Sequence, residues 1–339
     1  MQRMNRRRLL CLALGAAGAA GLGWYGRSSA HSRLREASRT GRALGTETTI
    51  TALHVSHARA ERAVNAAFDE LERVEWLLSI YRPESQVSRL NRHGRLADPH
   101  EHLLTVLDHA QRISWRSGGA FDVTVQPLWN LFHQAQSRGA LPDEAAIATA
   151  RQLVDFRSLD VSRNEIRLRR QNAAITLNGI AQGYAADRVA AVLAEHGVEH
   201  ALVNAGEMVP LGKSTDGDQW TVGIQHPRQG DAYAAIVRLD GRALATSGDY
   251  ATTFSDDFRF HHLFDPRTGI SPTELASVSV VAPTAMAADA LSTALFVLGP
   301  ARGLDLIGQT PGADAFLVLK DGRTRATGGF PLVADGGTA

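Results

Sequence analysis

The chain has 339 residues, a formal net charge of +1, 44% hydrophobic residues and 21% charged residues. This composition is typical of a soluble globular protein, and the length suffices for one large domain or two smaller ones. The near-zero net charge gives no argument for nucleic acid, and the aromatic content of 6% disfavours a surface on which bases stack. We therefore expect no nucleic-acid partner.

The first 30 residues have the pattern of an export signal. An arginine cluster at residues 6–8 precedes a short run rich in Ala, Gly and Leu that extends to about residue 24. This pattern resembles a twin-arginine signal, and the small residues at 28–30 suit cleavage. The run is shorter than the ~20 residues that span a membrane, which favours cleavage over an uncleaved anchor. We expect recognition by the export machinery and a periplasmic protein, free or associated with the inner membrane.

The only cysteine, Cys11, lies inside this signal segment. The mature protein is therefore expected to have neither disulfides nor thiol chemistry, which excludes thiol nucleophiles and cysteine-ligated zinc. After the signal, residues 31–43 are interpreted as an N-terminal linker, residues 44–330 as a single domain, and residues 331–339 as a flexible tail.

Hydrophobic periodicity predicts a mixture of helices and strands along the domain. Helices are expected over residues 58–78, 103–115, 143–154, 183–195 and 284–298. Strands are expected over residues 45–53, 201–204, 220–225, 233–239, 243–246, 261–264 and 278–282, with paired strands over 166–177 and a hairpin over 315–327. Strict βαβ alternation, a GxGxxG motif and a P-loop are absent from the sequence. The fold class is therefore α+β, with largely antiparallel sheets packed with helices.

The helix expected over residues 284–298 carries a single acid in an otherwise apolar sequence, with Thr284 as a candidate N-cap and Gly299 as part of the stop signal. Asp289 and Thr293 are four residues apart and share one helix face. A buried carboxylate needs a partner, and a hard cation with oxygen ligands is one candidate. Alternatively, Asp289 interacts with the helix dipole and Thr293 with the carbonyl four residues before it.

Three further segments have residues that suit phosphate chemistry. Thr-Ser-Gly-Asp-Tyr at 246–250 can bring backbone N–H groups to a phosphate, or form an ordinary turn. His261 and His262 face opposite ways before a type I turn, so one of them can act as a general base, or both are partly exposed strand residues. Gly179, between a strand and a helix, can expose its carbonyl to a ligand.

Taken together, these segments resemble the ApbE family, the FAD:protein FMN transferases. The resemblance rests on Thr-Ser-Gly-Asp-Tyr at 246–250, His-His-x-x-Asp-Pro-x-Thr-Gly at 261–269 and Ala-Asp-Ala-x-x-Thr at 288–293, in this order. Further blocks of the family are similar to the segments at 44–46, 78–91 and 117–124. The resemblance runs from residue 44 to 330 and implies the ApbE fold, which is T-fold-like.

Family members bind FAD and Mg²⁺, cleave the pyrophosphate, and attach FMN through a phosphoester to a threonine or serine of a target protein. The resemblance implies that Asp289, Thr293 and the carbonyl of Gly179 hold the metal. It places His262 near the phosphates, where it is our first choice as the base for the acceptor hydroxyl, with Asp265 or Asp249 as alternatives. Residues that the resemblance places at FAD are Leu44, Tyr81, Ala120, Phe121, Asp122, Gln182, Ser247 and His262.

Two positions depart from the family pattern, because Gln182 replaces the usual lysine and Glu207 a usual glycine. Two alternatives to transfer therefore remain, namely Mg²⁺-dependent hydrolysis of FAD to FMN and AMP, and flavin binding without turnover. The target implied by export and family is a periplasmic or membrane electron-transfer flavoprotein of the NqrC, RnfG or NosR kind. A NosX-like accessory role in nitrous oxide reduction is one specific possibility.

Overall fold

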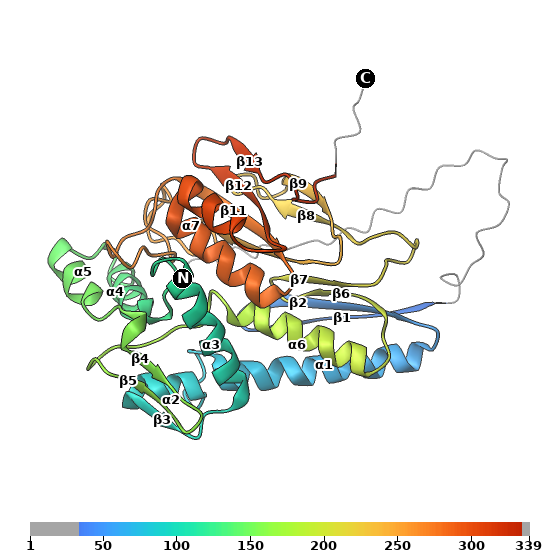
Figure 1. Ribbon diagram of the computed structural model, residues 1–339, viewed down its shortest axis with the longest axis horizontal. Helices are drawn as coiled ribbons and strands as arrows, with labels where there is room; N and C mark the ends of the chain where they lie inside the picture. The colour runs from blue at the N-terminus through green and yellow to red at the C-terminus, as the bar shows by residue number, and fades with distance from the viewer. Residues whose placement is uncertain (1–33, 334–339) are drawn as a thin grey trace.

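The computed structural model describes residues 34–333, which are organised around one large antiparallel sheet (Figure 1). Its strand order is β1-β2-β6-β7-β10-β11-β12-β13. The strands are β1 (Arg35–Ala43), β2 (Thr46–His54), β6 (His200–Asn204), β7 (Met208–Leu211), β10 (Ala243–Gly248), β11 (Leu275–Ala282), β12 (Asp314–Leu319) and β13 (Thr324–Ala326). Two smaller antiparallel sheets contain β3 (Arg95–Ala97), β5 (Glu165–Leu168) and β4 (Leu159–Val161), and β8 (Thr221–Gln225) and β9 (Tyr233–Arg238).

Three long helices pack side by side against one face of the large sheet (Figure 1). They are α1 (His57–Leu78), α6 (Ala181–Glu195) and α7 (Ala285–Gly308). The β8–β9 ribbon packs on the opposite face, where Trp220, Val237 and Phe316 join one apolar cluster. The remaining helices are α2 (Gln86–His93), α3 (Glu101–Arg116), α4 (Gln126–Gln136) and α5 (Glu144–Arg151). The predicted α+β class is confirmed.

Helix α7 runs through the core as the sequence indicates. It is the one helix within residues 34–333 that is long and apolar enough to cross a membrane, yet 72% of its apolar stretch is buried in the protein. The Thr284 side chain accepts a hydrogen bond from the Ala287 N–H, as expected of an N-cap. Gly299 leaves helical geometry with φ 77° and ψ 174°, and Pro300 opens the second half of the helix. The predicted stop therefore falls at a real break between two helical segments.

Two predicted strands are wrong. Residues 261–264 make only an isolated bridge, between His261 and Thr253, because the backbone N–H of His261 donates to the Ser271 hydroxyl instead of a strand. In residues 166–177 only β5 forms. The chain leaves the sheet after Leu168. The Asn91 side chain accepts a hydrogen bond from the Ile175 N–H at 2.7 Å and donates one to the Ile175 carbonyl oxygen at 2.8 Å, in place of a neighbouring strand.

The limits predicted for the domain are also too narrow. The predicted linker at residues 31–43 contains β1, which pairs with β2 along nine residues. Because β1 is the edge strand, both of its faces are largely polar, and apolar and polar residues do not alternate clearly along it. In the predicted tail, the Pro331 carbonyl accepts from Arg238 and the Val333 N–H donates to Ile236, which extends the β8–β9 ribbon. The predicted signal and Cys11 lie outside the described residues.

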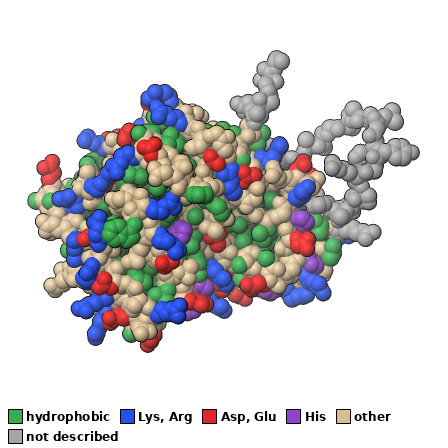
Figure 2. All heavy atoms as spheres, in the orientation of Figure 1, with side chains coloured by type: hydrophobic (Ala, Val, Ile, Leu, Met, Phe, Trp, Pro, Cys, Tyr) green, Lys and Arg blue, Asp and Glu red, His purple; other side chains and the backbone are tan. Residues whose placement is uncertain are grey.

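Charged side chains are mixed on the face of the molecule seen in Figure 2. Basic and acidic groups alternate over this face without a broad field of one sign. Recognition of a charged ligand must therefore come from local geometry rather than from long-range attraction across this face.

Candidate active site

The start of α6 and the first half of α7 meet at a buried carboxylate. Asp289 is 4% exposed, and its Oδ2 accepts a hydrogen bond of 3.1 Å from the backbone N–H of Gly183. A Cβ atom at Gly183 would lie 2.3 Å from the Ala285 carbonyl oxygen. Glycine at this position therefore permits the close approach of α6 and α7 that brings this N–H to the carboxylate.

Hydroxyl groups from α7 and β10 meet one helical turn along α7 from Asp289. The Thr293 Oγ1 atom is 3.2 Å from the Oγ of Ser247, which is also 2.7 Å from the Oγ of Ser292. A Cβ at Gly179 would lie 3.0 Å from Thr293 Oγ1. The structure thus brings Gly179, Ser247, Thr293 and Asp289 together from three separate segments of the chain.

A second buried acid, Glu207, lies in the turn between β6 and β7. It is 5% exposed, and its Oε2 has no hydrogen-bond partner. Burial raises the pKa of Glu207 well above its ordinary value, and the charge of Asp289 raises it further. Burial likewise raises the pKa of Asp289, against which the Gly183 N–H acts. A cation between these groups would stabilise their ionised forms.

The donor atoms of this cluster fit a hard divalent cation such as Mg²⁺. They are carboxylate, hydroxyl and backbone carbonyl oxygens, and the unpaired Glu207 Oε2 is a buried acceptor that lacks a partner. Within residues 34–333 no three His, Cys, Asp or Glu side chains form a metal-ligand group. A cation here would therefore take several of its ligands from hydroxyls, a carbonyl and a bound phosphate.

The two adjacent histidines have different environments. His261 is fully buried, its Nε2 donates to the Pro272 carbonyl oxygen at 3.0 Å, and burial lowers its pKa to about 4. His262 is half-buried, and its Nδ1 lies 3.2 Å from the Thr252 carbonyl oxygen. Because a carbonyl only accepts, Nδ1 carries the hydrogen and Nε2 is left as the basic nitrogen. Burial lowers the pKa of His262, so this nitrogen is unprotonated at neutral pH.

The two acids considered as alternative bases are held in ion pairs. Both oxygens of Asp249 accept from Arg228 at 2.7 Å, and Lys320 Nζ lies 2.8 Å from Oδ2. Asp265 accepts two hydrogen bonds from the Arg267 guanidinium, at 2.8 and 2.7 Å. Because the oxygens of both carboxylates are already bonded to cationic side chains, His262 is the better candidate.

Asp249 should instead stabilise the fold. Replacing it with Asn leaves the partly exposed Arg228 and Lys320 without their shared carboxylate, and we expect a loss of roughly 2–4 kcal/mol in the free energy of unfolding. Urea denaturation measures this loss. The matched control is Asp321→Asn, which breaks the solvent-exposed pair with Arg323 and should change little. Equal effects of the two substitutions would contradict this assignment.

The segment at 120–122 is buried beside the cluster. The Phe121 ring lies near Gly179, since a Cβ there would be 3.6 Å from Phe121 Cε2. Asp122 accepts from the N–H and hydroxyl of Thr124 and from the Phe156 N–H, and burial raises its pKa to about 6. Ala120 is also buried. The side chain of Asp122 is therefore occupied in holding the loop in place.

The remaining predicted flavin residues are Leu44, Gln182 and Tyr81, of which only Gln182 is next to a residue that contacts Asp289. Leu44 is in the β1–β2 turn with φ 51°, and its N–H donates to Glu75. The Gln182 Nε2 atom would be 3.2 Å from a Cβ placed on Gly206, so it lies against the β6–β7 turn. Tyr81 is 65% exposed. These residues come from the β1–β2 turn, the first turn of α6 and the segment that follows α1.

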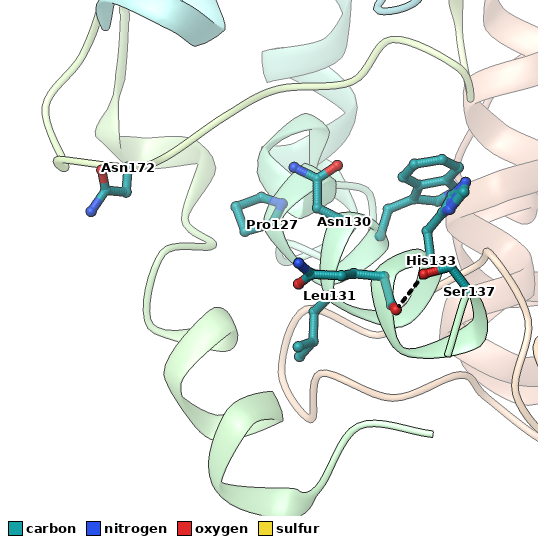
Figure 3. Close-up of a pocket in the computed structure, with 8 residues that line it drawn as sticks. Pro127, Asn130, Leu131, His133, Ser137 and Asn172 are labelled. Atoms are coloured by element: carbon teal, nitrogen blue, oxygen red, sulfur yellow. Dashed lines mark hydrogen bonds between the residues drawn. The ribbon is translucent and has the colours of Figure 1, made fainter. Parts of the chain in front are cut away.

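Tyr81 contacts Trp129, one of the residues that line a surface hollow along α4, and Figure 3 shows this hollow. The Tyr81 ring meets that of Trp129 edge to face, with centroids 6.4 Å apart. The hollow is lined by Pro127, Trp129, Asn130, Leu131, His133, Gln134, Ser137 and Asn172. None of these belongs to the predicted site residues. The hollow therefore adjoins one predicted flavin residue but does not contain the acidic cluster.

Sequence reasoning missed two contributors to the cluster. Ser292 connects β10 to α7 through Ser247, and Asp187 accepts the N–H groups of Ala285 and Met286 at the start of α7. Asp187 lies eight residues after Gly179, but the sequence offered no signal for its distant partners. Only the packing of α6 on α7 brings them together.

The large sheet, the three helices on it and the oxygen-rich acidic cluster define an α+β protein with a buried candidate active site. The chain belongs to the ApbE family, whose model matches residues 44–317, so the resemblance is confirmed. A curated relative named FAD:protein FMN transferase, from Treponema pallidum, is 32% identical over 331 residues and covers 90% of each chain.

Solved structures of the family have the same fold. The ApbE protein of Thermotoga maritima superposes with a TM-score of 0.78 at 27% identity, over 87% of this chain and 97% of that one. The flavinyl transferase ApbE of Pseudomonas stutzeri gives 0.76 at 32% identity, over 87% and 95%. The match across nearly the full length of both structures means that the fold is that of the family.

Proposed function

We propose that the chain transfers FMN from FAD to a threonine or serine of a target protein in a Mg²⁺-dependent reaction. The observation that carries this proposal is the convergence of Asp289, Thr293 and Ser247 with the Gly179 backbone. Such a set of oxygen donors suits a divalent cation, which would neutralise negative charge on the pyrophosphate. Membership of a family whose curated relatives are named FAD:protein FMN transferase supports the same reaction.

Different residues of the chain would bind the metal and accept the proton. Asp289, Thr293 and the Gly179 carbonyl would hold Mg²⁺, which neutralises charge that develops on the phosphates. Nε2 of His262 accepts the proton of the acceptor hydroxyl. The hydrogen bond from Nδ1 to the Thr252 carbonyl keeps the imidazole in the tautomer that leaves Nε2 unprotonated. The hydroxyl oxygen bonds to the phosphorus of the FMN half. The bond from this phosphorus to the bridging oxygen breaks, and AMP leaves with that oxygen.

Incubation of the purified chain with FAD, Mg²⁺ and a candidate electron-transfer target tests the proposal. Mass spectrometry should find an FMN-sized gain on the target, with one AMP released for each modified target. A target whose acceptor threonine is replaced with valine is the control and should gain nothing. AMP and FMN without labelling would favour hydrolysis of FAD by water. Bound FAD without either product would favour the accessory role, which Gln182 and Glu207 motivate.

We also propose that the chain acts in the periplasm on a flavoprotein of the NqrC, RnfG or NosR kind. The arginine cluster and short apolar run of the first 30 residues support export by the twin-arginine route. Fractionation of expressing cells tests the location, and recovery of the folded chain only from the cytoplasm would contradict it.

A further inference from the structure

Glu207 is a charged residue in a place where the fold gives it little compensation. Its side chain is 5% exposed, and its Oε2 is buried without a hydrogen-bond partner. Its neighbour Gly206 packs against Gln182, which directly precedes the Gly183 whose N–H bonds to Asp289 on α7, and the charge of Asp289 raises the pKa of Glu207. An ionised carboxylate in such surroundings is costly unless a cation or several donors accompany it.

The neighbours of Glu207 supply no fixed positive charge. Gln182, which is neutral, lies against the turn that carries Glu207. In the part of the chain that the structure describes, no lysine, arginine or histidine forms an ion pair with Glu207 or Asp289. The charge of another acid, Asp187, raises the pKa of Asp289. Both Asp187 oxygens accept N–H groups at the start of α7.

We propose that Glu207 is a further ligand of the divalent cation held by Asp289, so that two carboxylates bind the cation in this chain. The inference rests on the proposed Mg²⁺ dependence. It explains why an acid with an unpartnered oxygen is buried beside Asp289, since the cation is the missing partner. Two carboxylates give tighter divalent binding than one, because affinity at oxygen sites increases with the number of charged ligands.

Binding of Mn²⁺, used as the probe metal without FAD, tests this role by titration calorimetry on the purified chain. Glu207→Gln keeps the size of the side chain and removes its charge, and we expect the Kd for Mn²⁺ to increase at least about 10-fold. The matched control is Glu199→Gln, an exposed acid just before β6, which should leave the Kd unchanged. Asp289→Asn is the reference for loss of an accepted ligand.

A second variant keeps Glu207 but gives its carboxylate a partner that competes with the metal. Gln182→Lys places an ammonium group against the β6–β7 turn, where it can pair with Glu207 in place of the metal. We expect the Kd for Mn²⁺ to increase about 10-fold here too, and the melting temperature of the metal-free protein to rise. This variant also covers the case in which Glu207→Gln fails to fold.

The outcomes separate the inference from the function on which it rests. If Asp289→Asn loses Mn²⁺ while Glu207→Gln and Gln182→Lys bind it as the wild type does, Glu207 is not a ligand and the proposed metal site stands. A lower melting temperature of Glu207→Gln with an unchanged Kd would likewise assign Glu207 a structural role only. If the wild type binds no Mn²⁺, both the inference and the proposed metal dependence are wrong.

Discussion

Replacing Asp289 with Asn should lower Mg²⁺-dependent FMN transfer by at least about 1,000-fold, which corresponds to roughly 4 kcal/mol of transition-state stabilisation. The asparagine oxygen can still accept the Gly183 N–H, so the junction of α6 and α7 is retained. The anionic metal ligand, however, is lost. Steady-state rates measured across a range of Mg²⁺ concentrations check this result.

The same substitution should not destabilise the metal-free protein. Burial raises the folded-state pKa of Asp289 above that of the unfolded chain, so ionisation of Asp289 opposes folding as pH rises. The Asn variant should therefore melt at a higher temperature than the wild type at pH 8. The difference should shrink as the pH falls from about 7 to 3.8 and vanish below that, where Asp289 is protonated in both the folded and the unfolded state. Asp305→Asn, an exposed change on the same helix, is the control. Wild-type activity in Asp289→Asn would remove Asp289 from the metal site.

Helical spacing explains why the centre of the site was predictable from the sequence. Asp289 and Thr293 are four residues apart in a helix whose N-cap and break could both be read, so their common face followed from local geometry. The flanking motifs could then be assigned by resemblance. Their actual proximity depends on the contact of α6 with α7, and the close approach at Gly183 is the detail that makes it possible.

Features that depend on distant contacts were not predictable from local patterns. β1 lacks clear alternation because it lies at the sheet edge. The apolar residues after His262 resemble a strand, but the His262 N–H bonds to the Thr252 carbonyl in a loop. From the sequence, Glu207 could be identified only as a replacement of the family's usual glycine. Only the packed structure places its charge beside that of Asp289.

Replacing His262 with Gln should lower the rate of transfer by roughly 100- to 10,000-fold, the range associated with loss of a general base. Glutamine is polar and similar in size, but its amide cannot take up the proton of the acceptor hydroxyl. Because His262 is half-buried and its Nδ1 already bonds to Thr252, the substitution should leave the fold intact. Single-turnover rates with saturating FAD and Mg²⁺ measure the effect on chemistry directly.

The pH dependence of kcat/KM distinguishes a base from a residue that only shapes the site. Burial lowers the pKa of His262 below its ordinary value of 6.5, so the basic Nε2 stays unprotonated through neutral pH. The wild-type rate should fall on the acid side only below pH 6.5, and this limb should be absent from the Gln variant. His93→Gln, an exposed change on α2, controls for the loss of a histidine. If Mn²⁺ binds to His262→Gln as to the wild type and the acid limb persists, another group takes the proton.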